Sequence, residues 1–195
     1  MQSIFERLAQ PLQRALWELG WKGLRDTQVQ ALPLILDTTD DVVISAATAA
    51  GKTEAAFLPL LTRLWQGDTG APQGVILYVA PVKALINDQV ERLQIFCERM
   101  DIPVYPWHGD VGLSSRQRFF ANPRGVVLIT PESLEALLFK RGAELQIFFA
   151  ALQIAVQLIF FYMANHEIKI CPSCGKSFEC KAGNITQCDC TKIVL

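Results

Sequence analysis

The stretch that decides the fold of this chain is Val42-Val43-Ile44-Ser45-Ala46-Ala47-Thr48-Ala49-Ala50-Gly51-Lys52-Thr53. Its first three residues are β-branched, which is typical of a short buried strand. A loop of small residues follows and closes on Gly51-Lys52-Thr53, after which Glu54 to Leu58 begins a helix. Strand, small-residue loop, Gly-Lys-Thr and helix, in this order, form the phosphate-binding loop arrangement.

Each residue type in this loop has a chemical reason. The small residues Thr48, Ala49, Ala50 and Gly51 let backbone N–H groups curl around phosphate oxygens, and the helix N-terminus adds partial positive charge. The Lys52 ammonium reaches the β- and γ-phosphates, and the Thr53 hydroxyl holds Mg²⁺. Ala46 stands where the strict pattern has glycine, so the alternative is a chance Gly-Lys-Thr in an Ala-rich helix start. The order of the elements favours the phosphate-binding loop.

Composition divides the chain into two unlike parts. The 195 residues are 51% hydrophobic, enough for one sizeable core with a small appendage. The net charge of −1 excludes a global basic field, so any contact with nucleic acid is local.

The N-terminus lacks the basic-then-apolar layout of a signal peptide, and we expect a cytoplasmic protein. In that compartment clustered cysteines indicate metal before disulfides. All but one of the cysteines lie in the C-terminal tail: Cys171, Cys174, Cys180, Cys188 and Cys190.

Helices and strands alternate along the body of the chain. The patterns predict helices over residues 3–20, 28–36, 54–65, 82–100, 114–120 and 134–140. They predict strands over residues 42–44, 75–80, 102–105 and 126–129. This alternation is typical of an α/β fold with a parallel sheet. Ligands of such sheets gather at the carboxyl ends of the strands, where we expect the loops at 46–53, 81–83, 108–110 and 130–132.

Five short blocks occur in a fixed order within residues 1–156: Leu24 to Leu32, Ser45 to Phe57, Ala80 to Gln89, Trp107 to Asp110, and Ile129 to Leu134. Together they resemble the first RecA-like domain of superfamily 2 DEAD/DEAH-box helicases, and most of all the large helicase-related (Lhr) type. The resemblance implies a RecA-like P-loop domain that binds ATP and Mg²⁺. It also implies contact with single-stranded DNA or RNA through the sugar-phosphate backbone, largely independent of sequence.

The resemblance assigns roles to the nucleotide residues. Gln28 looks like the residue that reads the adenine edge with its paired donor and acceptor, and Arg25 looks like its support. Lys52 and Thr53 keep their phosphate and Mg²⁺ roles. Taken alone, Gln28 has an ordinary alternative as a surface glutamine.

The resemblance also marks a path for nucleic acid. Pro81, Lys83, Thr130 and Pro131 match positions that line the strand in this family. The alternatives are a solvated Lys83 and an ordinary helix start at Thr130-Pro131. His108 falls beside the same path, where a solvated loop histidine is favoured over a catalytic role.

The resemblance stops after Val156. The family carries Asp-Glu-x-His at the end of the next strand, where Asp holds Mg²⁺ through water and Glu orients the attacking water. Here Gln157 to Tyr162 follow instead, and no carboxylate occurs between Glu144 and Glu167. We expect the second RecA-like domain to be missing as well. We therefore expect a truncated ATP-binding domain over residues 1–156 and a junction over 157–162, with nucleotide bound and hydrolysis reduced by orders of magnitude.

Residues 145–165 are uncharged, mostly apolar and long enough to span a bilayer. Gln146, Gln153 and Gln157 argue against a membrane helix, and the family context predicts a helix end and a core strand over residues 147–156. We expect no membrane contact, and the sequence gives no oligomeric state.

Residues 163–195 form a cysteine-rich segment. Cys171-Pro172-Ser173-Cys174 is a knuckle that places two thiolates on one metal, and Cys180, Cys188 and Cys190 offer the remaining ligands of a tetrahedral Zn²⁺ site. Which of these three is spare stays open, and a redox pair or unligated thiols are the alternatives. Residues 170–180 resemble the start of the small cysteine-rich CWC proteins of bacteria, which implies metal binding. Whether the junction is natural or a sequence artefact stays open.

Overall fold

The computed structural model describes residues 3–46, 50–65, 74–140, 146, 148, 150, 152–157, 168–170 and 177–179. The chain divides into two compact units. The first unit comprises Met1–Lys22 and Leu60–Ile159, and the second comprises Gly23–Pro59 and Phe160–Leu195. Each unit is treated by itself below.

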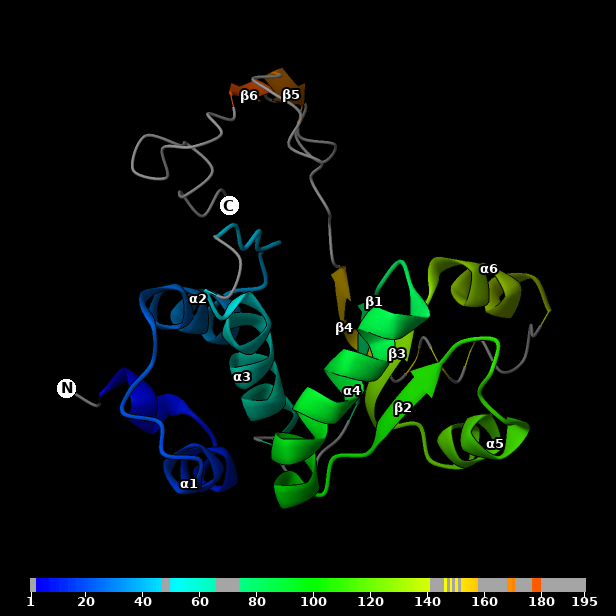
Figure 1. Cartoon of the computed structure of the whole chain (residues 1–195), viewed down its shortest axis with the longest axis horizontal. Coiled ribbons are helices and arrows are strands. Elements are labelled where there is room, and N and C mark those ends of the chain that lie inside the picture. Colours follow the sequence, from blue (N-terminus) through cyan, green and yellow to red (C-terminus); the bar gives the residue numbers. More distant parts are fainter. Residues whose placement is uncertain are drawn as a thin grey trace. The chain divides into compact units, whose positions relative to one another are not determined.

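A parallel sheet forms the centre of the first unit (Figure 1). Its strands are β1 Val75–Val79, β2 Val104–Trp107, β3 Gly125–Ile129 and β4 Leu152–Gln157, in the order β2-β3-β1-β4. The short apolar runs of β1 and β3 are buried, as expected for strands covered on both faces. The predicted α/β fold with a parallel sheet is confirmed, although β2 lies two residues later than the predicted range 102–105.

Helices cover both faces of this sheet. On one face, alternate strand residues and Trp107 pack with side chains of α5 Leu113–Ala121 and α6 Pro131–Lys140, and the cluster comprises Val75, Leu77, Trp107, Phe119, Val127, Ile129, Leu137 and Phe148. α4 Lys83–Cys97 lies against β2 and β3. Tyr78 points to the other face, and burial raises its pKa to about 12. On α4, the charge of Arg92 lowers this pKa and the charge of Asp88 raises it. The sheet is therefore the middle layer of this unit.

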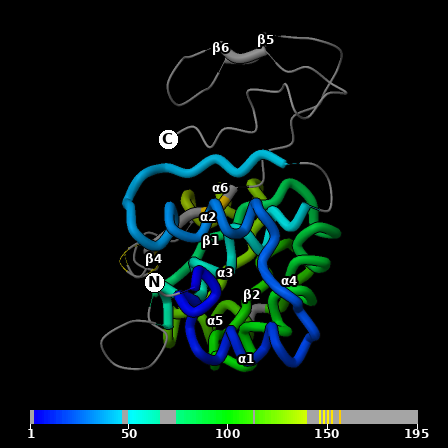
Figure 2. Tube along the Cα trace, turned by 90° about the vertical axis from the view of Figure 1, so that its left-hand side faces the viewer, coloured from blue at the N-terminus to red at the C-terminus, as the bar shows by residue number. Residues whose placement is uncertain are grey.

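The N-terminal segment is broken where one helix over residues 3–20 was predicted. A 3-10 helix, η1 Ile4–Arg7, is followed by α1 Gln10–Glu18. Pro11 explains the break, because a proline lacks an N–H and is tolerated only in the first turn of a helix. α1 lies beside α4 (Figure 2) and contacts η2 Glu98–Met100, the 3-10 turn that follows α4. Arg99 pairs with Glu18 at 3.1 Å.

The second unit contains α2 Asp26–Asp37 and the N-terminal part of α3 Lys52–Trp65, which continues into the first unit. It also contains β5 Ile168–Ile170 and β6 Ser177–Glu179, which pair antiparallel. The predicted strand over residues 42–44 is wrong: this segment is in no strand, and Val43 is 46% exposed. Three apolar residues between Asp41 and Ser45 are a short run, and local propensity alone does not fix a strand.

The apolar stretch at 145–165 contains strand β4, so the predicted core strand in this region is confirmed. Among the residues that the structure describes, none of the helices combines the length and apolar character needed to cross a membrane. The remainder of that stretch, apart from residues 146, 148 and 150, lies outside the described residues.

Candidate nucleotide and nucleic-acid sites

The first site centres on Gln28, in the first turn of α2. Its carboxamide oxygen accepts a hydrogen bond from the backbone N–H of Arg25 at 2.9 Å, which fixes the side chain against the start of the helix. Gln28 is only 2% exposed, so the alternative of a surface glutamine is wrong. A buried amide held in one orientation presents a defined donor and acceptor edge, which is the property that recognition of a base requires.

Gly51 of the predicted phosphate-binding loop lies directly against this amide. The backbone of Gly51 has a φ of +81°, and a Cβ built on it would lie 2.6 Å from Nε2 of Gln28. Only glycine combines this conformation with such a close approach. The structure therefore brings together two predicted nucleotide residues that are far apart in the sequence.

Lys52 begins α3 immediately after this glycine. Its ammonium group donates a hydrogen bond to the carbonyl of Ala46 at 2.6 Å, which closes the loop on itself. Gly51 accepts a hydrogen bond from the N–H of Ala55 at 2.9 Å, so the helix starts within the loop. An ammonium group, a helix N-terminus and a glycine cradle suit phosphate oxygens, and these residues therefore fit ATP. Thr53 is the next residue of α3, Ala50 precedes the glycine, and Thr48 and Ala49 lie outside the described residues.

The second site is a groove of about 950 Å³ in the first unit. Because β1, β2 and β3 are parallel, the segments that follow their carboxyl ends meet at one edge of the sheet. The residues of these segments that line the groove include Pro81, Lys83, Trp107, Gly109 and Thr130, and α5 adds Arg116. Three of the four predicted nucleic-acid residues are therefore brought together, while Pro131 is the first residue of α6 and does not line the groove.

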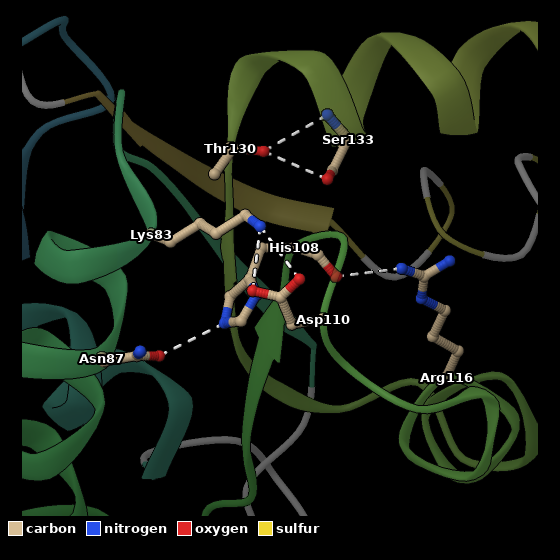
Figure 3. Close-up of polar contacts among 7 residues, drawn as sticks. All are labelled: Lys83, Asn87, His108, Asp110, Arg116, Thr130 and Ser133. Atoms are coloured by element: carbon tan, nitrogen blue, oxygen red, sulfur yellow. Dashed lines mark hydrogen bonds and ion pairs between the residues drawn. The ribbon is translucent and has the colours of Figure 1, made fainter.

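Lys83 is paired rather than simply solvated. Its ammonium group lies 2.8 Å and 3.0 Å from the two carboxylate oxygens of Asp110, and both side chains are exposed (Figure 3). The hydrogen bond from Lys83 holds the pKa of the Asp110 carboxyl below its usual range, so the carboxylate stays ionised at neutral pH. No sequence pattern predicts this pairing, because Lys83 follows β1 and Asp110 follows β2.

Thr130 caps the N-terminus of α6. Its hydroxyl oxygen accepts the backbone N–H of Ser133 at 3.3 Å and lies 3.1 Å from the Ser133 hydroxyl (Figure 3). A threonine commonly caps a helix in this way, so the alternative of an ordinary helix start is correct for Thr130. Thr130 also lines the groove.

His108 and Arg116 form a partly buried cluster beside Trp107. His108 is 6% exposed and its Nε2 lies 3.2 Å from Oδ1 of Asn87, so the interpretation as a solvated loop histidine is wrong. Arg116 donates to the carbonyl of His108 at 3.2 Å, and its guanidinium lies 5.4 Å from the centre of the Trp107 ring. The sequence predicts the helix that carries Arg116, over residues 114–120, but no motif marks Arg116 itself.

The cysteine tail is only partly described. The five cysteines predicted as metal ligands lie outside the described residues, although β5 ends just before Cys171 and β6 begins just after Lys176. Within the described ranges, no group of three or more His, Cys, Asp or Glu side chains is placed to hold a metal ion.

Comparisons with known proteins identify the family of the chain. Residues 25–156 match the family described as DEAD/DEAH box helicase. The DEAD-box ATP-dependent RNA helicase CshC of Bacillus cereus is 31% identical over 134 residues, covering 68% of this chain and 33% of its own length. The Lhr helicase/probable uracil glycosylase of Mycolicibacterium smegmatis is 35% identical over 130 residues, covering 60% of this chain and 9% of its own length.

Solved helicase structures are also similar to this chain. The DUF1998 helicase MrfA bound to DNA and AMPPNP superposes with a TM-score of 0.67 at 26% identity, covering 78% of this chain and 21% of MrfA. Mss116p bound to single-stranded RNA and AMP-PNP gives a TM-score of 0.67 at 17% identity over 80% of this chain and 32% of its own, which shows the fold alone.

The fold is that of a RecA-like helicase domain, and the chain belongs to the DEAD/DEAH box helicase family. It is similar to both Lhr-type and DEAD-box members. The chain spans a third or less of the length of these two curated relatives.

Proposed function

We propose that this chain binds an adenine nucleotide at Gln28, Gly51 and Lys52 and a single nucleic-acid strand in the groove, with greatly reduced ATP hydrolysis. The contact between the Gln28 amide and Gly51 supports the nucleotide part most directly. It joins a base-reading amide to a phosphate-binding loop within one unit. Arg25 supports the amide through its backbone N–H.

The phosphates would lie on the loop that ends at Gly51, with the Lys52 ammonium exchanging the Ala46 carbonyl for a phosphate oxygen. The Thr53 hydroxyl would hold Mg²⁺, and the ion would neutralise phosphate charge when bound. Thr48, Ala49 and Ala50 would contribute backbone N–H groups to the same cradle.

Hydrolysis is expected to be weak because of the residues that follow β4. This strand pairs with β1 and ends at Gln157, and its carboxyl end is where the family carries Asp-Glu. The sequence instead continues with residues 158–166, none of which is acidic, and the next carboxylate is Glu167. A domain without these groups has no carboxylate there to orient the attacking water or to hold Mg²⁺ through its water ligands.

The groove supports the nucleic-acid part of the proposal. Pro81, Lys83 and Thr130 line it, and a lysine ammonium and a threonine hydroxyl are groups that contact a sugar-phosphate backbone. MrfA has been solved bound to DNA and CshC is named an RNA helicase, so the relatives leave the choice between DNA and RNA open. We propose single-stranded nucleic acid of either kind.

The test is nucleotide affinity measured with a fluorescent ATP analogue. Lys52→Ala is expected to weaken binding at least tenfold, because a charge-assisted contact to phosphate is lost. Lys22→Ala removes the same charge from an exposed position in the first unit and should leave the affinity unchanged. Equal affinities for wild type and Lys52→Ala would contradict the phosphate-binding loop, and ATP turnover at rates normal for a helicase would contradict the loss of hydrolysis.

We also propose that the tail binds one Zn²⁺ ion, as the likeness to the CWC proteins implies. The antiparallel pair of β5 and β6 flanks the Cys-x-x-Cys of residues 171–174 in the sequence, and this spacing commonly supplies two ligands of a zinc site. Cys171→Ser should abolish bound zinc in elemental analysis, and unchanged zinc content would remove the proposal.

A further inference from the structure

The groove contains two cationic side chains in different electrostatic situations. Lys83 comes from the start of α4, and Arg116 comes from the first half of α5. Both contribute to the lining of the same groove, and Figure 3 shows them on either side of the loop that carries His108 and Asp110. Only Lys83 belongs to a motif that the sequence had marked for nucleic-acid contact.

Lys83 is occupied by a carboxylate before any ligand arrives. Asp110 contacts its ammonium group with both oxygens, at 2.8 Å and 3.0 Å. A phosphate that binds Lys83 must therefore replace Asp110, and the carboxylate is then left beside the incoming negative charge. The pair lowers the attraction that this lysine offers to a nucleic-acid strand.

Arg116 has no such partner. Of its five N–H donors, one bonds to the carbonyl of His108 at 3.2 Å, and the buried Nε atom has no hydrogen-bond partner. Glu132 also lines the groove, but across the described part of the chain no carboxylate pairs with Arg116. Three N–H groups on the two Nη atoms have no partner in the described part of the chain, and because Arg116 lines the groove these donors are the ones that an oxyanion can reach.

The surroundings of Arg116 hold its guanidinium in place. The group stacks over the Trp107 ring at 5.4 Å, and Trp107 itself is 2% exposed and fixed by edge-to-face contacts with Phe119 and Phe120. The ring contact and the hydrogen bond to His108 hold the planar cation in place, so it loses little conformational entropy when it binds a ligand. A guanidinium can present two parallel donors to an oxyanion.

We propose that Arg116 is a further phosphate-binding residue of this groove and that it contacts a phosphodiester of the strand through two N–H groups. The inference rests on the proposed binding of nucleic acid in the groove. In this arrangement Arg116 provides the contact that forms without displacing a carboxylate, and Lys83 adds its contact only when a phosphate replaces Asp110.

The experiment measures the affinity of the full chain for a fluorescein-labelled oligothymidylate and an oligouridylate of equal length, over a series of salt concentrations. Each neutralised phosphate of a single strand contributes about 0.7 to the slope of log affinity against log salt. Arg116→Gln should weaken binding by about tenfold and lower that slope by about 0.7. Arg118→Gln removes the same charge two residues along α5, outside the groove lining, and should leave the slope unchanged.

Arg116→Lys keeps the charge but not the two parallel donors. It should retain the slope and weaken binding several-fold. It also serves if Arg116→Gln does not fold, and near-ultraviolet circular dichroism of the Trp107 environment checks folding of each variant.

An unchanged slope in folded Arg116→Gln, or an unchanged affinity in Arg116→Lys, would overturn the role of Arg116 while leaving binding in the groove intact. A wild-type chain that binds neither oligonucleotide at low salt would overturn the proposed function itself, and the inference with it.

Discussion

Replacement of Gly51 by alanine tests the contact on which the nucleotide site depends. The backbone φ of +81° already penalises any side chain, by about 1–2 kcal/mol for a left-handed conformation. A Cβ would also lie 2.6 Å from Nε2 of Gln28, so the two groups would have to separate by about 1 Å to reach ordinary contact. The shift would strain the hydrogen bond from Arg25 to Gln28, which contributes about 1 kcal/mol.

Two other glycines separate these contributions. Gly20 has a φ of +73° and nothing within 4 Å of its missing Cβ, whereas Gly23 has neither a positive φ nor a neighbour within 4 Å. Gly23→Ala should change the free energy of unfolding by less than about 0.5 kcal/mol. Gly20→Ala should destabilise by about 1 kcal/mol from the backbone alone, and Gly51→Ala by roughly 2–3 kcal/mol.

Urea unfolding measures these stabilities, and the fluorescent ATP analogue measures binding in the same variants. Gly51→Ala should lose most of its nucleotide affinity, whereas Gly20→Ala and Gly23→Ala should retain theirs. Gln28→Ala should cost about 1 kcal/mol less in the Gly51→Ala background than in the wild type, because the hydrogen bond that it removes is already strained there. If Gly51→Ala unfolds no more easily than Gly20→Ala and binds nucleotide normally, the contact between Gly51 and Gln28 plays no part in the site.

Asp110→Asn should tighten oligonucleotide binding about two- to fivefold and steepen its salt dependence, because Lys83 no longer exchanges a carboxylate for a phosphate. The pKa of Asp110 is held below its usual range, so the wild-type pair persists from about pH 8 to about pH 5 and is lost only as pH falls through that lowered value. The gain in affinity of Asp110→Asn over the wild type should therefore be constant over this interval. A gain that fades toward pH 5 would contradict the pairing. Cys97 should resist iodoacetamide at pH 8 in the native chain and react quickly in urea, because burial raises its pKa to about 12 and leaves only about one thiol in 10⁴ ionised. Mass spectrometry of the peptide that contains Cys97 measures both rates, and rapid native labelling would show that the thiol is not buried.

The sequence predicted the sheet of the first unit well because its strands are short apolar runs bounded by turn residues. Residues 75–80 and 126–129 match β1 and β3 closely, since strands buried on both faces have an unbroken apolar pattern. The order of helices and strands then restricted the fold to a parallel α/β arrangement. The loops between these elements carry most of the blocks that resemble the helicase family, and residues 25–156 match that family.

The predicted strand over residues 42–44 failed for a physical reason. Val42, Val43 and Ile44 satisfy the local preference for a strand, but a strand is stabilised by neighbours that no local pattern contains. The break in the N-terminal helix was visible in principle, since Pro11 restricts where a helix can begin. The periodicity of the leucines over residues 3–20 outweighed that signal in the prediction.

The charge pairs of the groove could not be predicted from the sequence, for a different reason. Parallel strands carry their following loops to one edge, so the meeting of residues 81–83, 109 and 130 could be expected from topology alone. Which charges pair after that meeting depends on side-chain geometry: Lys83, marked by a motif, is already bound to Asp110, whereas Arg116, marked by none, retains an unused donor. Motifs therefore locate the contact with nucleic acid more reliably than they predict its strength, because the strength depends on the partners that each cation has before the strand binds.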